Sequence, residues 1–200
     1  MAITADEVKK LREKTDAGFM DCKKALEECG GNFDEAVDLL RKKGIAVATK
    51  KADKATKQGI VASYIPAGDQ VGVMLEVNCQ TDFAARTPQF REFAHNVAMQ
   101  IAAMRPRWVS RDDVPADAIG RERAVLIEQS KAEGKPENIA EKMVEGRMRK
   151  FFEEYCLLDQ KYIRDDSMTI NDLMLDLTGK CGELIVVRRF VRFQVGEELE

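Results

Sequence analysis

The first forty residues place apolar side chains at helical spacing in three short runs, separated by residues that form turns. Thr4 and Glu7 open the first run with a capping-box pattern, in which a threonine oxygen and a glutamate carboxylate close the first helical turn. A glycine pair at 30–31 ends the second run, and Gly44 can end the third. The pattern predicts a three-helix module over residues 1–44, which can bury only a small core.

The pattern changes after Gly59, where runs of β-branched residues replace the helical spacing and predict strands. Residues 60–65 and 71–78 are rich in β-branched side chains and flank a short turn, which is typical of a hairpin. A loop is expected at 79–88, and residues 183–195 are the longest strand candidate. Together the three strands predict a small antiparallel sheet.

Helical spacing returns between the predicted strands. Helices are expected over residues 90–101, 117–133, 137–154 and 169–178. Residues 155–168 show no regular period, so they are expected to be irregular. The part of the chain from 58 to 200 is therefore predicted to be an α+β core, in which helices cover the small sheet.

Charge is spread unevenly along the chain, although its net value is only −3. Residues 41–57 carry seven lysines and arginines against one acidic residue, Asp53. Such a run is typical of a linker or a solvated helix, and residues 45–57 are assigned as a basic linker. A phosphate-binding strip is the alternative. No aromatic residue that could stack on bases lies between Phe33 and Tyr64, so direct contact with nucleic acid is not expected.

Single residue types exclude several kinds of chemistry. The chain has one histidine, and none of its five cysteines forms a C-x-x-C pair, so a metal site is not expected. The sequence also lacks the glycine motifs of phosphate and dinucleotide sites, so no cofactor is expected. Cys79 and His95 are the nearest candidates for a nucleophile and its base. The alternative is that Cys79 is a buried apolar thiol and His95 a solvated imidazole.

Cysteine usage and hydropathy bear on where the chain works. No stretch approaches the ~20 apolar residues that a membrane span needs. Five scattered cysteines without a signal peptide indicate the reducing cytoplasm.

One aromatic side chain interrupts the small and polar residues between the hairpin and the next helix. Phe83 stands between Asp82 and two alanines, Ala84 and Ala85, and Arg86 follows them. In one interpretation Phe83 folds into the core or packs on the next helix. In the other it is an exposed anchor that enters a pocket of a partner protein, with Asp82 fixing its direction and the small neighbours allowing close approach.

Several segments, taken together, carry a resemblance to a known family. The two long ones are residues 11–26 (LREKTDAGFMDCKKAL) and 76–86 (EVNCQTDFAAR). Three short ones are residues 144–147, 157–160 and 188–193. They follow one another in the family's order over nearly the whole chain. On these residues the chain resembles the elongation factor Ts family, although the family usually has valine where Ala84 stands.

The resemblance implies a translation elongation factor without cofactor or bond chemistry of its own. It implies that the chain binds elongation factor Tu in its GDP form and promotes GDP release, so that GTP can rebind. By the same resemblance, Phe83 inserts between two helices of the partner's nucleotide-binding domain and displaces its magnesium and phosphate contacts. The residues expected to support this contact are Asp82, Ala84, Ala85 and Arg86.

The resemblance also assigns a role to each predicted domain. The three-helix module is expected to be ubiquitin-associated-like and to contact the partner's nucleotide-binding domain. The residues expected to make this contact are Leu11, Arg12, Phe19 and Met20. The chain resembles the short form of the family, with one core, and such forms tend to be homodimers. The core over 58–200 is then a dimerisation domain too, and Phe190, which stands beside arginines on a strand, is compatible with an interface.

Overall fold

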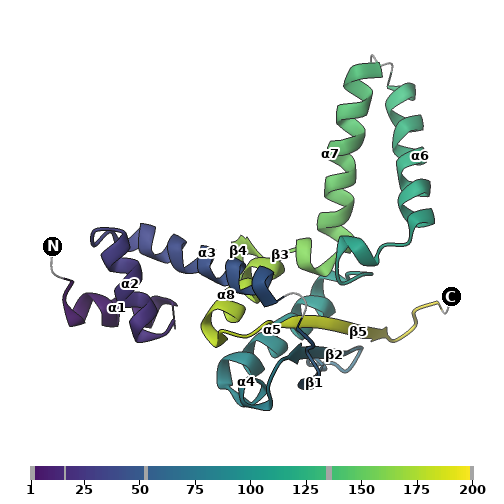
Figure 1. Cartoon of the computed structure of the whole chain (residues 1–200). Coiled ribbons are helices and arrows are strands. Elements are labelled where there is room, and N and C mark those ends of the chain that lie inside the picture. Colours follow the sequence, from purple (N-terminus) through teal and green to yellow (C-terminus); the bar gives the residue numbers. More distant parts are fainter. Residues whose placement is uncertain (1–2, 16, 52–53, 134–136, 199–200) are drawn as a thin grey trace. The chain divides into compact units, whose positions relative to one another are not determined.

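Residues 3–15, 17–51, 54–133 and 137–198 are described by a computed structural model of the chain (Figure 1). Helices and a small sheet make up most of them, which confirms the predicted α+β class. The chain divides into two compact units. Unit 1 holds the chain up to Ala62 together with Leu75–Asn96 and Asp172–Arg188. Unit 2 holds Ser63–Met74, Val97–Asn171 and the chain from Arg189 onward.

The N-terminal part of unit 1 is the predicted three-helix module, with α1 (Ala5–Thr15), α2 (Phe19–Glu28) and α3 (Phe33–Lys51). The capping box opens α1 as expected, because the Thr4 amide donates to the Glu7 carboxylate at 2.7 Å and the Glu7 amide donates to the Thr4 hydroxyl at 3.3 Å. A small core joins the three helices. Its fully or almost fully buried members are Val8, Leu11, Cys22, Ala25, Leu26 and Ala36.

Helix α3 does not end at Gly44 as the sequence suggested, but continues to Lys51. Gly44 instead lies against α8 (Ile170–Cys181), where a Cβ would come within 2.7 Å of the Leu175 carbonyl oxygen and 3.4 Å of the Gly179 Cα. The glycine therefore allows two helix backbones to meet and does not act as a stop. The first part of the expected basic linker is thus helical, residues 52–53 lie outside the described residues, and the domain boundaries at 44 and 57 stay predictions.

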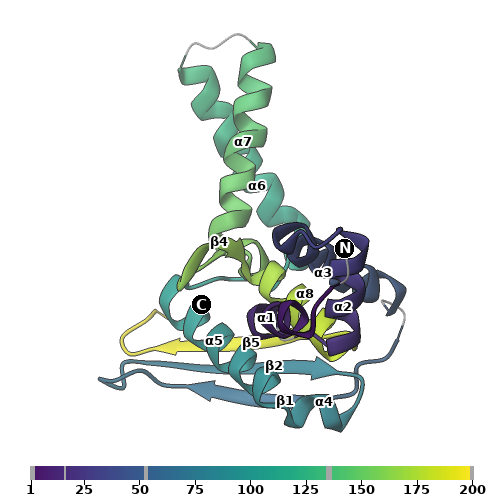
Figure 2. The same ribbon diagram turned by 90° about the vertical axis from the view of Figure 1, so that its left-hand side faces the viewer.

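Three strands form the main sheet: β1 (Gln58–Tyr64), β2 (Val71–Cys79) and β5 (Val186–Gln194), in the order β1-β2-β5. Their arrows alternate in direction in Figure 2, as the antiparallel prediction requires. Alternate residues of β2 are buried, beginning at Val73, and helix α5 (Pro88–Met104) lies along one face of the sheet (Figures 1 and 2). Both units contain part of each strand.

Two predictions about loops were wrong. The expected loop at 79–88 contains a short helix, α4 (Asp82–Arg86). Within the expected irregular stretch 155–168, β3 (Lys161–Tyr162) pairs antiparallel with β4, which runs over Asp165–Thr169. The β3–β4 pair is held by a residue far away in the sequence.

The side chain of Gln100 on α5 holds the stretch that leads into β3. Its amide nitrogen donates to the Gln160 side chain at 3.1 Å and to the Lys161 carbonyl at 3.0 Å. Its amide oxygen accepts from the Ile163 amide at 3.0 Å. Gln100 is completely buried, so these bonds satisfy a polar group that would otherwise be costly.

The remaining helices of unit 2, α6 (Ala116–Ala132) and α7 (Glu137–Tyr155), are close to their predicted ranges and form an antiparallel hairpin (Figure 1). Leu126, Val144 and Met148 are the buried centre of this hairpin. Two single 3-10 turns, Arg111–Asp113 and Leu157–Asp159, complete the described elements.

Candidate protein-binding site

Helix α4 presents one large aromatic side chain to solvent. Phe83 is 79% exposed, more than any other large apolar side chain among the described residues, while Ala84 and Ala85 beside it are buried. The interpretation that Phe83 folds into the core is therefore wrong. A five-residue helix with its small side chains facing inward leaves Phe83 as the part that can enter another protein.

Threonines close both ends of α4. The Ala84 amide donates to the Thr81 hydroxyl oxygen at 3.3 Å, which makes Thr81 the N-cap. At the other end the Thr87 hydroxyl donates to the Ala84 carbonyl at 2.8 Å and accepts from the Phe90 amide at 3.3 Å. The second threonine thus joins the end of α4 to the start of α5.

A carboxylate from the segment between α8 and β5 binds the N-cap of α4. The Thr81 amide donates to one oxygen of Glu183 at 3.0 Å, and the Thr81 hydroxyl donates to the other at 2.6 Å. Next to this pair the Leu184 amide donates to the Gln80 side-chain oxygen at 3.3 Å. Glu183 and Gln80 could not be assigned to the site from sequence, because the bonded partners stand more than 100 residues apart and no local pattern links them.

The charged residues of α4 pair with one another. Arg86 and Asp82 lie one helical turn apart, with a nitrogen and an oxygen 2.9 Å from each other, and both side chains are substantially exposed. Exposed pairs of this kind contribute roughly 0.2–1 kcal/mol. Both groups therefore remain available to a partner at little cost.

The thiol of Cys79 is held as a neutral donor. Its Sγ donates to the Thr81 carbonyl at 3.1 Å. Burial raises the pKa of this thiol, and the nearby Glu183 carboxylate raises it further. A nucleophilic cysteine needs the opposite shift, toward the thiolate. Cys79 is therefore a packing residue of β2, and His95 is exposed on α5.

Of the four residues expected to bind a partner through the module, three are exposed and one is buried. Arg12, Phe19 and Met20 are exposed, with the last two opening α2 at 45% and 59% exposure. Leu11 is completely buried in the core of the module. Its side chain therefore supports the helices that carry the other three.

Two of the basic residues in the run 41–57 have acidic partners within unit 1. Arg41 forms an ion pair with Asp172 on α8, and the Lys43 ammonium lies 3.3 Å from the Glu28 carboxylate. These pairs lower the local positive charge that a phosphate-binding strip would need.

The described part of the chain has neither a metal-binding cluster nor a membrane-spanning helix. Within it, no group of three or more histidine, cysteine, aspartate or glutamate side chains is placed to hold a metal ion. Nor does any helix there combine the length and apolar character that crossing a membrane requires.

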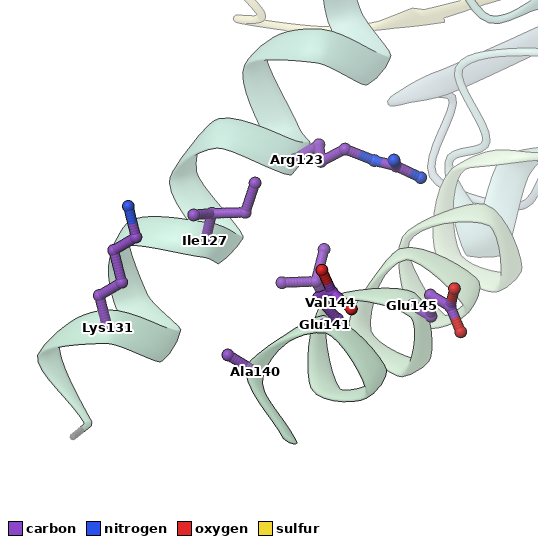
Figure 3. Close-up of a pocket in the computed structure, with 7 residues that line it drawn as sticks. All are labelled: Arg123, Ile127, Lys131, Ala140, Glu141, Val144 and Glu145. Atoms are coloured by element: carbon purple, nitrogen blue, oxygen red, sulfur yellow. The ribbon is translucent and has the colours of Figure 1, made fainter. Parts of the chain in front are cut away.

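A hollow of about 560 Å³ lies between α6 and α7 in unit 2 (Figure 3). Ile127 and Val144 face it, with Arg123 and Lys131 on one side and Glu141 and Glu145 on the other. The described residues that line the hollow include no serine, cysteine or histidine, so they form no nucleophile–base pair of the usual kinds.

Known proteins with similar sequences extend over the whole of this architecture. The family model described as "Elongation factor TS" matches residues 4–197. The elongation factor Ts of Syntrophobacter fumaroxidans is 54% identical over 198 residues, which cover 99% of each chain. That of Desulfitobacterium hafniense is 53% identical over 99% of this chain and 91% of its own. The elongation factor Ts of Thermotoga petrophila is 52% identical over the full length of both chains.

Proposed function

Since the chain belongs to the elongation factor Ts family, we propose that it is the guanine nucleotide exchange factor of elongation factor Tu in translation. It binds the GDP form of elongation factor Tu and promotes GDP release, so that GTP can rebind. The observation that carries this proposal is the exposed Phe83 on the capped helix α4, within the segment that resembles the family.

Phe83 acts as a wedge in this proposal. It inserts between two helices of the partner's nucleotide-binding domain and displaces the magnesium and phosphate contacts there. An aromatic side chain that becomes buried in a pocket commonly contributes at least ~2 kcal/mol to binding. The buried Ala84 and Ala85 back the wedge, while Asp82 and Arg86 lie on the exposed side for polar contact.

The driving force is linkage between two ligands of the partner. If this chain binds nucleotide-free elongation factor Tu more tightly than the GDP form, it must weaken GDP binding by the same factor. No bond is made or broken, and the magnesium belongs to the partner. This chain then needs a rigid contact surface and no catalytic group, which agrees with the neutral, hydrogen-bonded thiol of Cys79.

The three-helix module supplies a second contact with the same domain of the partner. Its exposed Arg12, Phe19 and Met20 are the contact residues that the structure supports, while Leu11 contributes through the module core. Phe19 and Met20 are the exposed large apolar side chains described in the three helices, so they are the apolar surface that a partner can cover.

A second copy of the chain covers the open face of the sheet, which we define as five exposed apolar residues in unit 2. They are Ile65, Met74, Val191, Phe193 and Val195. Phe190, the candidate from sequence, is half-buried. Val191 and Phe193 alternate along β5 and so lie on the same face of the sheet, and exposed apolar patches mark contact surfaces. The homodimer is therefore proposed to form through this open face.

All five cysteines are free thiols, which suits action in the reducing cytoplasm. Nucleic-acid binding is not part of the proposal, given the paired basic residues Arg41 and Lys43.

Release of a labelled GDP from elongation factor Tu tests the proposed function. The label is followed in excess unlabelled GDP, with and without this chain. We expect the release rate to rise with the concentration of the chain until it saturates. Release that stays at the spontaneous rate at saturating concentration would exclude the exchange function.

A further inference from the structure

We infer that Glu183 is a positioning residue for exchange: it holds α4 in the orientation that presents Phe83 to the partner. The inference rests on the proposed function and adds to it a residue from the other end of the core, which no feature of the resemblance assigns. Glu183 acts through Thr81 and does not itself contact the partner.

The first argument is the completeness of the contact. Each oxygen of the Glu183 carboxylate accepts one hydrogen bond from Thr81, at 3.0 Å from the amide and 2.6 Å from the hydroxyl. Hydrogen bonds to an ionised acceptor are roughly twice as strong as neutral ones. Two of them on a single residue fix both the position and the rotamer of Thr81.

The second argument is that the bonds form a chain with one direction. The Thr81 hydroxyl donates a hydrogen bond to Glu183. Its oxygen is therefore left to accept from the Ala84 amide, which is the bond that caps α4. Removing the carboxylate frees the hydroxyl to rotate and weakens the cap. The effect reaches Phe83, which lies between Thr81 and Ala84.

The third argument is that α4 is too short to hold itself. A helix of five residues has barely passed the unfavourable nucleation step, so its order must come from contacts outside it. The described contacts are the burial of Ala84 and Ala85, the Thr87 cap and the Glu183 carboxylate. Glu183 acts on Thr81, the residue that opens the helix, through both its amide and its hydroxyl, whereas the Cys79 thiol reaches only the Thr81 carbonyl.

Position matters because the wedge works by entering a pocket. A side chain that is ordered before binding loses less conformational freedom when it binds. A mobile α4 would still carry Phe83 but would present it correctly only part of the time. The expected defect is thus slower exchange by a chain that remains folded.

The test is a double-mutant cycle on the rate of stimulated GDP release per unit concentration of the chain. The proteins compared are the wild type, Glu183→Ala, Phe83→Ala and the double variant. We expect Glu183→Ala to slow exchange roughly tenfold, because residues in one hydrogen-bond network couple by amounts of this order. In the Phe83→Ala background the same change should have almost no effect, since there is no wedge left to position.

Two further variants keep the test decisive. Glu183→Gln retains one acceptor oxygen and should exchange at an intermediate rate, and it carries the same cycle if Glu183→Ala does not fold. Asp176→Ala on α8 is the matched control, because it removes a carboxylate that forms an ion pair with Lys180 at 2.8 Å and none with α4 among the described residues, and it should exchange like the wild type.

Either of two results would overturn the inference. One is a folded Glu183→Ala variant with the wild-type exchange rate. The other is a Glu183 effect of equal size with and without Phe83, which would mean that the carboxylate acts on general stability. Both results differ from failure of the proposed function, in which the wild type itself does not release GDP.

Discussion

At the scale of single residues, Phe83 is the most exposed large apolar side chain that the structure describes. A phenylalanine that is 79% exposed leaves most of its apolar surface in water, although burial of such a ring is worth roughly 1.5–3 kcal/mol. The neighbouring Ala84 and Ala85 are buried, so the inward-facing positions of α4 hold small side chains and the aromatic one faces solvent. In the proposed function, a partner that covers the ring recovers this cost.

Cys79 offers a test of the alternative that it is a nucleophile with His95 as its base. Its Sγ donates to the Thr81 carbonyl, a bond that a serine hydroxyl can replace at the same place. We expect Cys79→Ser to exchange GDP within about twofold of the wild type, because it changes stability and not the exposed surface. Loss of activity in a folded Cys79→Ser protein, measured in the GDP-release assay, would return the cysteine to the list of essential groups.

Cys156 links stability to pH. Burial raises the pKa of its thiol from 9.0 to about 11, with the Asp159 carboxylate adding to the rise. Between these values the unfolded chain loses the proton while the folded chain keeps it, so the free energy of unfolding falls as the pH rises. We expect a fall of about 2 kcal/mol from this group between pH 9 and pH 11, measured by urea unfolding. Cys156→Ala should flatten the slope, and an unchanged slope would contradict the assignment.

At the scale of elements, α3 and α8 cross closely, and glycines at the crossing let the two backbones meet. Gly44 meets the Leu175 carbonyl oxygen and Gly179, all of them backbone contacts that cannot move aside easily. A side chain at this crossing would push the module away from the helix that leads to Glu183. The crossing therefore links the three-helix module to the helix that precedes Glu183, which binds the N-cap of α4.

Two glycine substitutions of opposite sign test this crossing. Gly44→Ala places a Cβ at 2.7 Å from a carbonyl oxygen, and we expect it to destabilise the chain by roughly 1–3 kcal/mol, as overpacking does. Gly146→Ala in α7 is the control, since nothing lies within 4 Å of its Cβ, and it should stabilise by about 1 kcal/mol through helix propensity. Thermal unfolding of the two variants checks both signs. A stabilising Gly44→Ala change would show that the helices do not meet there.

The long periodic elements could be predicted from sequence, because burial of one face imposes a pattern on many residues. This holds for α1, α2 and α5 and for the hairpin of β1 and β2. Helix α4 has too few residues to show a period, and β3 and β4 depend on Gln100, which lies about sixty residues away.

The candidate site divides in the same way. Phe83 could be singled out as an aromatic among small and polar neighbours, although its exposure could not be decided from the pattern. The Glu183 carboxylate that holds Thr81 could not be found, since its pairing exists only once the sheet has formed. The role of Leu11 was likewise beyond the pattern, because an apolar residue on an amphipathic helix can face either the core or a partner.

At the scale of the whole molecule, the open face predicts association of two chains. Phe193 on β5 is 64% exposed within this face. We expect sedimentation to show a dimer, and Phe193→Glu to raise its dissociation constant by roughly thirtyfold or more, since ~2 kcal/mol at a contact residue corresponds to that factor.

A charge placed elsewhere controls for general effects. Val125→Glu puts the same group at an exposed apolar position of α6, and it should leave the dimer intact. A Phe193→Glu chain that sediments like the wild type would remove the open face as the dimer interface.

The central claim is that an exposed phenylalanine on α4 drives GDP release from elongation factor Tu, and Phe83→Ala tests it most directly. The rate of labelled GDP release is measured against the concentration of the wild type, of Phe83→Ala and of Ile127→Ala, which truncates an exposed apolar residue on α6. The account predicts that Phe83→Ala folds normally and stimulates release roughly thirtyfold less, from a loss of ~2 kcal/mol, while Ile127→Ala matches the wild type. A folded Phe83→Ala protein that releases GDP as fast as the wild type would contradict it.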